Sequence, residues 1–196
     1  NPEGMKTELV QIADRGDRET GAVAYGIALN FAKLSKPIKD LLFELIPKEI
    51  SDENVSKAIH VITAITFYFE YISVDYVDHV KSILCNLAYN TYTTIAVVQQ
   101  IATHFDKLPS DIQKIIFDFA DDEHAIAGAA VSRAITANYD RLPSNVRDLL
   151  FKMTDKKNSA ESLKYVLETN PYSKVPENIK NELLNRMREK DAGRDT

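Results

Sequence analysis

The side chains of this 196-residue sequence best suited to metal binding or nucleophilic chemistry are four histidines and one cysteine: His60, His79, His104, His124 and Cys85. A metal site needs several ligands that converge on one point. Two of the histidines have an acidic neighbour in the sequence, Asp78 beside His79 and Glu123 beside His124, and they fall in different parts of the chain, so the spacing favours ordinary surface or core histidines. The sequence therefore predicts no metal site and no cofactor.

The single cysteine does not have the surroundings of a nucleophile. A nucleophilic thiol needs a base held beside it. Cys85 instead shares the helical phase of three phenylalanines, Phe43, Phe117 and Phe151, and we expect a buried, inert thiol there. The sequence also shows no glycine-rich phosphate loop and no Walker-type lysine. Together these features predict a protein without enzymatic activity.

Composition narrows the expected partners and compartment. The formal net charge of -5 argues against a nucleic-acid partner, which would need a basic stripe. One cysteine excludes an internal disulfide framework and suits a reducing compartment. The most apolar run, 61–69, is far shorter than the roughly 20 residues that span a bilayer, and no signal peptide is visible. We expect a cytoplasmic protein that does not enter a membrane.

The helices that are expected to carry these side chains follow a pattern that repeats along the chain. Residues 108–141 contain two apolar-periodic runs separated by a polar break at 121–123, and the pattern starts again at Leu142. Self-similarity at a period of about 34 residues, built from two helical halves, is typical of an α-solenoid. The repeat units are expected to start near Asn1, Leu34, Tyr76, Leu108, Leu142 and Val175.

The repeat predicts an all-α chain of about five helix pairs plus a C-terminal capping helix at 176–190. We expect one domain over 1–190 and a disordered tail at 191–196. The second pair is the irregular one, with helices at 36–45 and 52–72 and a start-to-start distance of 42 residues. The other predicted helices cover 1–14, 19–33, 76–88 and 91–105, followed by two halves in each of 108–141 and 142–174.

Two sets of apolar residues mark the register of the repeat. Aromatic residues stand three positions before four unit starts, with isoleucines four positions earlier: Phe31, Phe105, Tyr139 and Tyr172; Ile27, Ile101 and Ile135. An apolar residue also opens the first helix of each unit: Met5, Ile38, Val80, Ile112, Val146 and Ile179. Because the aromatic and isoleucine positions share one helical face, we expect them to pin the two helices of a unit together.

The paired helices, the Asp-rich turn and the Ala-rich second helix resemble HEAT-like repeats. The segment 119–130 is similar to the HEAT pattern of an Asp turn leading into Val-Arg, although Ile126 and Ala127 stand in place of that pair. The resemblance implies a right-handed HEAT/ARM-like superhelix and a scaffold that binds macromolecules along its concave face. Some HEAT-like proteins are metal-dependent hydroxylases or DNA glycosylases. The scattered histidines and the absence of Trp disfavour both.

Charge is concentrated on the first helix of each unit and is sparse on the second. The second helices therefore offer the candidate partner-binding face. Counting back nine positions from each following unit start gives Tyr25, Phe67, Gln99, Arg133 and Val166, with Gln100 and Thr103 beside the row. Tyr and Arg are enriched among residues that dominate interface energy, so Tyr25 and Arg133 are the expected anchors. The alternative is a plain inner surface without a partner, since fold alone does not confer function.

The aromatic run at 67–76 supports two interpretations. Its rings can fill the space created by a longer second helix, as aromatics at helical spacing usually do. Alternatively, Phe67, Tyr68 and Tyr71 form an exposed patch for self-association or for a partner. The function predicted overall is a non-enzymatic protein–protein interaction scaffold. The alternative, from a different class, is a nucleic-acid-binding or repair-associated HEAT-like protein.

Overall fold

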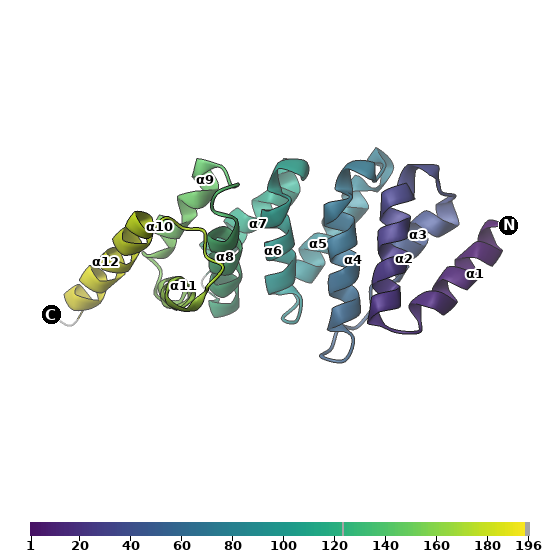
Figure 1. Ribbon diagram of the computed structural model, residues 1–196. Helices are drawn as coiled ribbons and strands as arrows, with labels where there is room; N and C mark the ends of the chain where they lie inside the picture. The colour runs from purple at the N-terminus through teal and green to yellow at the C-terminus, as the bar shows by residue number, and fades with distance from the viewer. Residues whose placement is uncertain (123, 195–196) are drawn as a thin grey trace. The chain divides into compact units, whose positions relative to one another are not determined.

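The computed structural model describes the backbone of residues 1–122 and 124–194, and the side chains as far as Lys190 except Glu123. Every regular element within these ranges is a helix (Figure 1), which confirms the predicted all-α class. Among the described residues, no helix combines the length and apolar character needed to cross a membrane.

Backbone contacts divide the chain into two compact units. Unit 1 comprises Asn1–Thr93 together with Asp106–Ile112. Unit 2 comprises Thr94–Phe105 together with the described residues from Gln113 onward. Each unit has its own set of internal contacts, and the single domain predicted over 1–190 stays a prediction.

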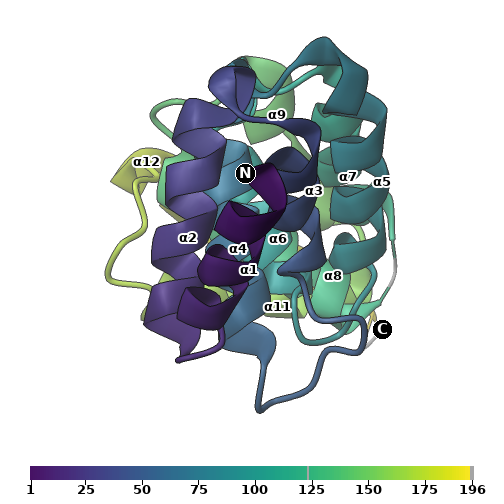
Figure 2. The same ribbon diagram turned by 90° about the vertical axis from the view of Figure 1, so that its right-hand side faces the viewer.

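Unit 1 is built on α2, which contacts α1, α3 and α4. Figure 2 shows α1 lying across α2 and α3. The helices are α1 (Pro2–Ala13), α2 (Asp17–Asn30), α3 (Lys36–Glu44), α4 (Val55–Phe67) and α5 (Val77–Ala88). Short 3-10 turns follow or precede them at η1 (Phe31–Lys33), η2 (Phe69–Tyr71) and η3 (Val74–Tyr76).

Unit 2 is built on α8, which packs against α6 on one side and α11 on the other. Figure 1 shows α6 beside α8. The helices are α6 (Thr94–Thr103), α7 (Ser110–Asp121, whose first turn belongs to unit 1), α8 (Ala125–Asn138), α9 (Ser144–Arg147), α10 (Leu149–Met153), α11 (Lys157–Thr169) and α12 (Glu177–Arg194), with the 3-10 turn η4 (Phe105–Lys107) after α6.

Helix boundaries follow local chemistry and differ from the prediction in several places. Pro2 and Pro37 lie in the first turns of α1 and α3, where a missing N–H breaks no helical hydrogen bond. The helix expected after Leu142 is divided at Asp148 into α9 and α10. The helix expected over 52–72 begins at Val55 and ends at Phe67. Lastly, α12 continues through Arg194, beyond its predicted end, while 195–196 lie outside the described residues.

The predicted pins are buried in the first and third helix pairs. Ile27, Ile101 and Ile135 are buried, as are Phe31 and Phe105. Tyr139 is half-buried and Tyr172, at the same repeat position, is 79% exposed. The prediction is wrong at Tyr172 because α11 ends at Thr169. The following Pro171 cannot continue a helix, and the ring therefore lies on a loop.

One expected core position, Cys85, also differs from the prediction, and the apolar residues that open the first helices vary in exposure. Met5 is about half exposed, on α1, while Ile38, Val80, Ile112 and Val146 are buried at the equivalent position. Cys85 is half-buried, where a buried thiol was expected. Phe117 and Phe151, which share its phase, are half-buried too. Phe43, at the same phase, is buried, so burial at this position differs from one helix to the next.

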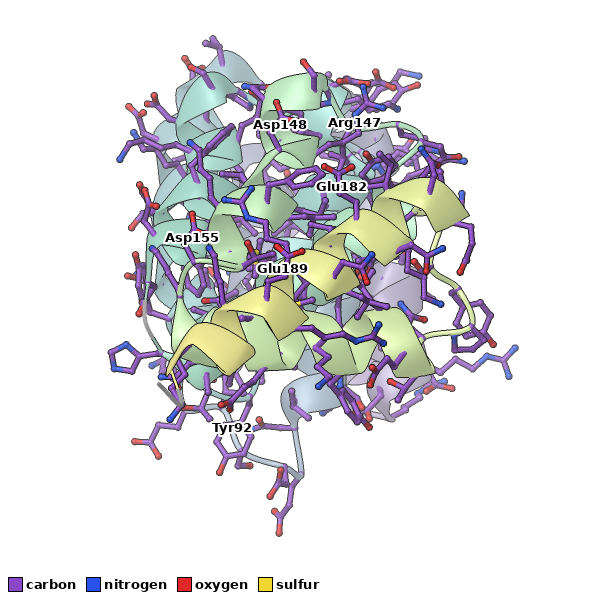
Figure 3. All side chains as sticks on the ribbon, turned by 90° about the vertical axis from the view of Figure 1, so that its left-hand side faces the viewer. Tyr92, Arg147, Asp148, Asp155, Glu182 and Glu189 are labelled. Carbon is purple, nitrogen blue, oxygen red and sulfur yellow. The ribbon has the colours of Figure 1, made fainter. Side chains whose placement is uncertain are left out.

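At the C-terminal end of unit 2, ion pairs join α12 to the turn before α11 (Figure 3, which labels Asp155). The Asp155 carboxylate accepts hydrogen bonds from Arg186, at 3.2 Å, and from Lys190. Apolar contact accompanies these charges, because Leu183, Leu184 and Met187 on the inner face of α12 are buried. The helix α12 therefore packs against α11.

A polar clamp in unit 1 makes stability sensitive to acid. Asp40 accepts hydrogen bonds from Lys36 Nζ at 2.7 Å and from Tyr76 Oη at 2.9 Å. The hydrogen bond from Lys36, followed by that from Tyr76, lowers the pKa of Asp40 below its ordinary value of 3.8, although burial opposes the shift. A carboxylate with a lowered folded-state pKa stabilises the fold above its unfolded pKa and loses that contribution as pH falls through the folded pKa.

We therefore expect Asp40→Asn to lower the melting temperature more at neutral pH than at pH values below the folded-state pKa of Asp40. Thermal unfolding of wild type and variant at both pH values, followed by circular dichroism, measures this difference. A gap in melting temperature that stays equal across the two conditions would contradict the assigned role of the Asp40 carboxylate.

Candidate partner-binding surfaces

Four aromatic side chains of unit 1 form one cluster, which we call the aromatic cluster: Tyr25, Phe67, Tyr68 and Tyr71. Tyr68 is at its centre. Its ring centroid lies 5.8 Å from that of Tyr25, 4.8 Å from that of Phe67 and 6.0 Å from that of Tyr71. All three pairs meet edge to face, the arrangement that aromatic quadrupoles favour. The rings therefore support one another.

The end of α4 explains how these rings come together. Tyr68 follows the last residue of α4 with non-helical dihedral angles, φ -103° and ψ 21°. The chain then forms η2, in which Phe69 is buried while Tyr71 points outward. Because α2 packs beside α4, Tyr25 on α2 reaches the ring of Tyr68. A continuous helix through residue 72 would not present this arrangement.

The aromatic cluster is partly exposed and has a charged border. Phe67 is 44% and Tyr71 46% exposed. Lys107 Nζ lies 5.9 Å from the Phe67 ring centroid and 3.6 Å from the Glu70 carboxylate. Burial, and then the neighbouring Tyr68, raise the pKa of Tyr25. Phe67 and Tyr71 are thus exposed, while Tyr68 between them is half-buried.

Unit 2 contains a second candidate surface, which we call the Arg133 hollow, with a volume of about 480 Å³. Three residues of the predicted row line it from three helices: Gln99 from α6, Arg133 from α8 and Val166 from α11. Val166 is only 3% exposed, so it lies at the base of the hollow and does not project from a ladder of exposed side chains.

The remaining predicted site residues do not line the hollow. Gln100 and Thr103 are half-buried on α6, and the Thr103 hydroxyl donates to the Gln99 carbonyl at 2.8 Å. The lining also includes Tyr165 and Tyr172, which are strongly exposed. The repeat had not predicted either of them as a binding residue. The signal for Tyr172 was the Asn170-Pro171 pair, which ends α11 and places the next residue on a loop.

The histidines and acidic residues of the described part of the chain do not gather into one cluster. Within 1–122 and 124–190, no group of three or more His, Cys, Asp or Glu residues is placed to hold a metal ion. His124 Nδ1 lies 2.6 Å from Asp122 Oδ1, an exposed contact within one turn. Its sequence neighbour Glu123 lies outside the described residues.

Comparison with protein-family models, with curated proteins and with solved structures finds no match to this chain. The resemblance to HEAT-like repeats therefore rests on the sequence repeat and is a prediction. The two surfaces are therefore the features of this chain that bear on its function.

Proposed function

We propose that this protein is a non-enzymatic interaction scaffold, a right-handed HEAT-like superhelix that binds a protein partner along its second helices. The observation that carries the proposal is the aromatic cluster of unit 1. Large exposed aromatic groups gathered in one place mark interaction sites more often than scattered exposed residues do. Tyr is also among the residue types that dominate binding energy at interfaces.

The geometry of the aromatic cluster suits a binding surface. Its edge-to-face contacts hold the rings in place before a partner arrives, and this lowers the entropy lost on binding. Tyr and Phe have two side-chain dihedral angles each, so they provide contact area at low entropic cost. The Lys107–Glu70 pair at 3.6 Å supplies the polar border typical of protein interfaces.

A protein partner accounts for this surface better than a nucleic acid does. Aromatic rings can stack on bases, but single-stranded nucleic acid also needs a positively charged groove along its backbone. Lys107 is the cation that contacts the aromatic cluster in unit 1, and the Glu70 carboxylate lies beside it. The formal net charge of -5 adds a repulsive background.

We expect Tyr71→Glu to abolish capture of the partner, because a charge would be buried in an apolar contact. The wild-type chain is used to recover the partner from extract, and binding is then measured with both proteins purified. Tyr92→Glu is the matched control, since Tyr92 is also 46% exposed but lies in the connection between α5 and α6. Equal binding by wild type and both variants would contradict the proposal.

Self-association through the aromatic cluster has a separate test. If the partner is a second copy, light scattering should show an oligomer for wild type and a monomer for Tyr68→Glu. A monomer for both, with equal melting temperatures, would contradict self-association through the aromatic cluster.

A further inference from the structure

The Arg133 hollow carries one charge that no neighbouring acid neutralises. Arg133 is the charged side chain among the residues lining it, and no carboxylate lines it. Among the described residues, none of the ion pairs of this chain includes Arg133. In a chain with a formal net charge of -5, an exposed arginine in a hollow is therefore available to pair with an acid from elsewhere.

Two tyrosines form the sides of the hollow, and hydrogen bonds fix the loop that carries one of them. Tyr165 belongs to α11 and Tyr172 to the loop that follows. The Tyr172 amide donates to Asn170 Oδ1 at 3.0 Å. The Lys174 amide donates to the Thr136 carbonyl on α8 at 2.8 Å, and Lys174 Nζ lies 3.3 Å from Asp140. These bonds hold the loop against α8, so the exposed ring is positioned in advance.

The side chains that line the Arg133 hollow are suited to binding an extended peptide. The Gln99 amide can donate to and accept from a peptide backbone, and the tyrosine rings and Val166 offer apolar contact. The planar guanidinium of Arg133 can form two parallel hydrogen bonds with one carboxylate. Ala137 and Thr169 lie at the carboxyl ends of α8 and α11, whose negative partial charge opposes a doubly charged phosphate more strongly than the singly charged carboxylate that pairs with Arg133.

We propose that the Arg133 hollow binds an extended segment of a protein partner through an Asp or Glu side chain, which pairs with Arg133, while Tyr165 and Tyr172 contact an adjacent apolar residue. This inference rests on the proposed interaction function and specifies the chemistry of the bound segment. It concerns unit 2 and does not depend on the aromatic cluster of unit 1.

The test is selection from a random peptide library on the immobilised full chain. Wild type is expected to enrich peptides with Asp or Glu next to an aromatic or aliphatic residue. Arg133→Glu should lose that preference and enrich Lys or Arg instead, because the charge at the hollow is reversed. Arg141→Glu is the matched control, since Arg141 is exposed but does not line the hollow, and it should select the same peptides as wild type.

Fluorescence anisotropy with one selected acidic peptide gives the magnitude. Arg133→Gln, which removes the charge without reversing it, should weaken binding about 30-fold or more, as expected when a dominant interface residue is lost. Circular dichroism confirms that each variant is folded. The melting temperature should change little, because Arg133 is exposed.

Three results would overturn the inference: no enriched peptide, enrichment without an acidic preference, or the same acidic preference in wild type and Arg133→Glu. None of them affects the proposed scaffold function, which is tested separately by the loss of partner capture in Tyr71→Glu. If Tyr71→Glu still binds the partner while the binding of acidic peptides depends on Arg133, the proposed surface in unit 1 is wrong. The inference about the Arg133 hollow is then still supported.

Discussion

Phe31→Ala is expected to lower the free energy of unfolding by about 3–5 kcal/mol, the range for truncating a buried phenylalanine. The Phe31 side chain is 0% exposed. Its ring meets the rings of Phe43 and Tyr76 at centroid distances of 6.2 and 5.0 Å, and Lys39 Nζ lies 5.4 Å from its centroid. Truncation would leave a cavity bordered by these groups. Urea unfolding at 25 °C measures the loss as a shift in midpoint at unchanged slope.

The matched control is Tyr172→Ala, at the same position of the sequence repeat. Tyr172 is 79% exposed, so its truncation should change the free energy of unfolding by no more than about 0.5 kcal/mol. Phe105 occupies the same repeat position and is buried, so Phe105→Ala should lower the free energy of unfolding about as much as Phe31→Ala does. Similar losses for Phe31 and Tyr172 would mean that burial does not follow the structure at this repeat position.

Gly128→Ala should destabilise the protein by about 1–3 kcal/mol, the usual cost of overpacking. A Cβ at Gly128 would lie 3.0 Å from Ser159 Cα and 3.1 Å from Ser159 Oγ. Because the nearest atom belongs to the backbone of α11, a side-chain rotation cannot relieve the contact. The helices α8 and α11 would have to move apart, and α11 contributes to the base of the Arg133 hollow. The same urea unfolding experiment measures this loss.

Gly26→Ala provides the opposite expectation at another glycine within a helix. No atom lies within 4 Å of a Cβ built at Gly26. The substitution should therefore stabilise the protein by about 0.5–1 kcal/mol, the difference in helix propensity between Ala and Gly. A loss of stability for Gly26→Ala, or a gain for Gly128→Ala, would contradict the helix packing described for α2 and α8.

The sequence repeat predicted the helices well because periodicity is a local property. Residues such as Ile27, Ile101 and Ile135 were placed correctly in the core by their spacing alone. The error at Cys85 has a different origin, since its exposure depends on which neighbouring helix covers that face. The hydrophobic periodicity continues unchanged through Asp148, so it could not predict the division between α9 and α10 at that residue.

The candidate surfaces were predicted in part. Counting along the repeat found Tyr25 and Phe67, which both contact Tyr68, and Gln99 and Arg133, which line one hollow. It could not show that Val166 is buried beneath that hollow, because this depends on the loop after α11. Tyr172 was placed on a helix by the same counting. The helix instead ends at Thr169, before Pro171, so Tyr172 lies on a loop.

The most direct test of the proposed binding face compares affinities for the purified partner. Tyr25→Ala combined with Arg133→Ala removes the two expected anchors, one from each unit. Lys114→Glu alters an exposed residue of α7, which pairs with Asp118 at 3.0 Å, on a first helix of the repeat. We predict that the double variant weakens binding by about 30-fold or more while Lys114→Glu binds as wild type does. Unchanged affinity in the double variant, together with loss of binding in Lys114→Glu, would show that the partner binds the opposite face.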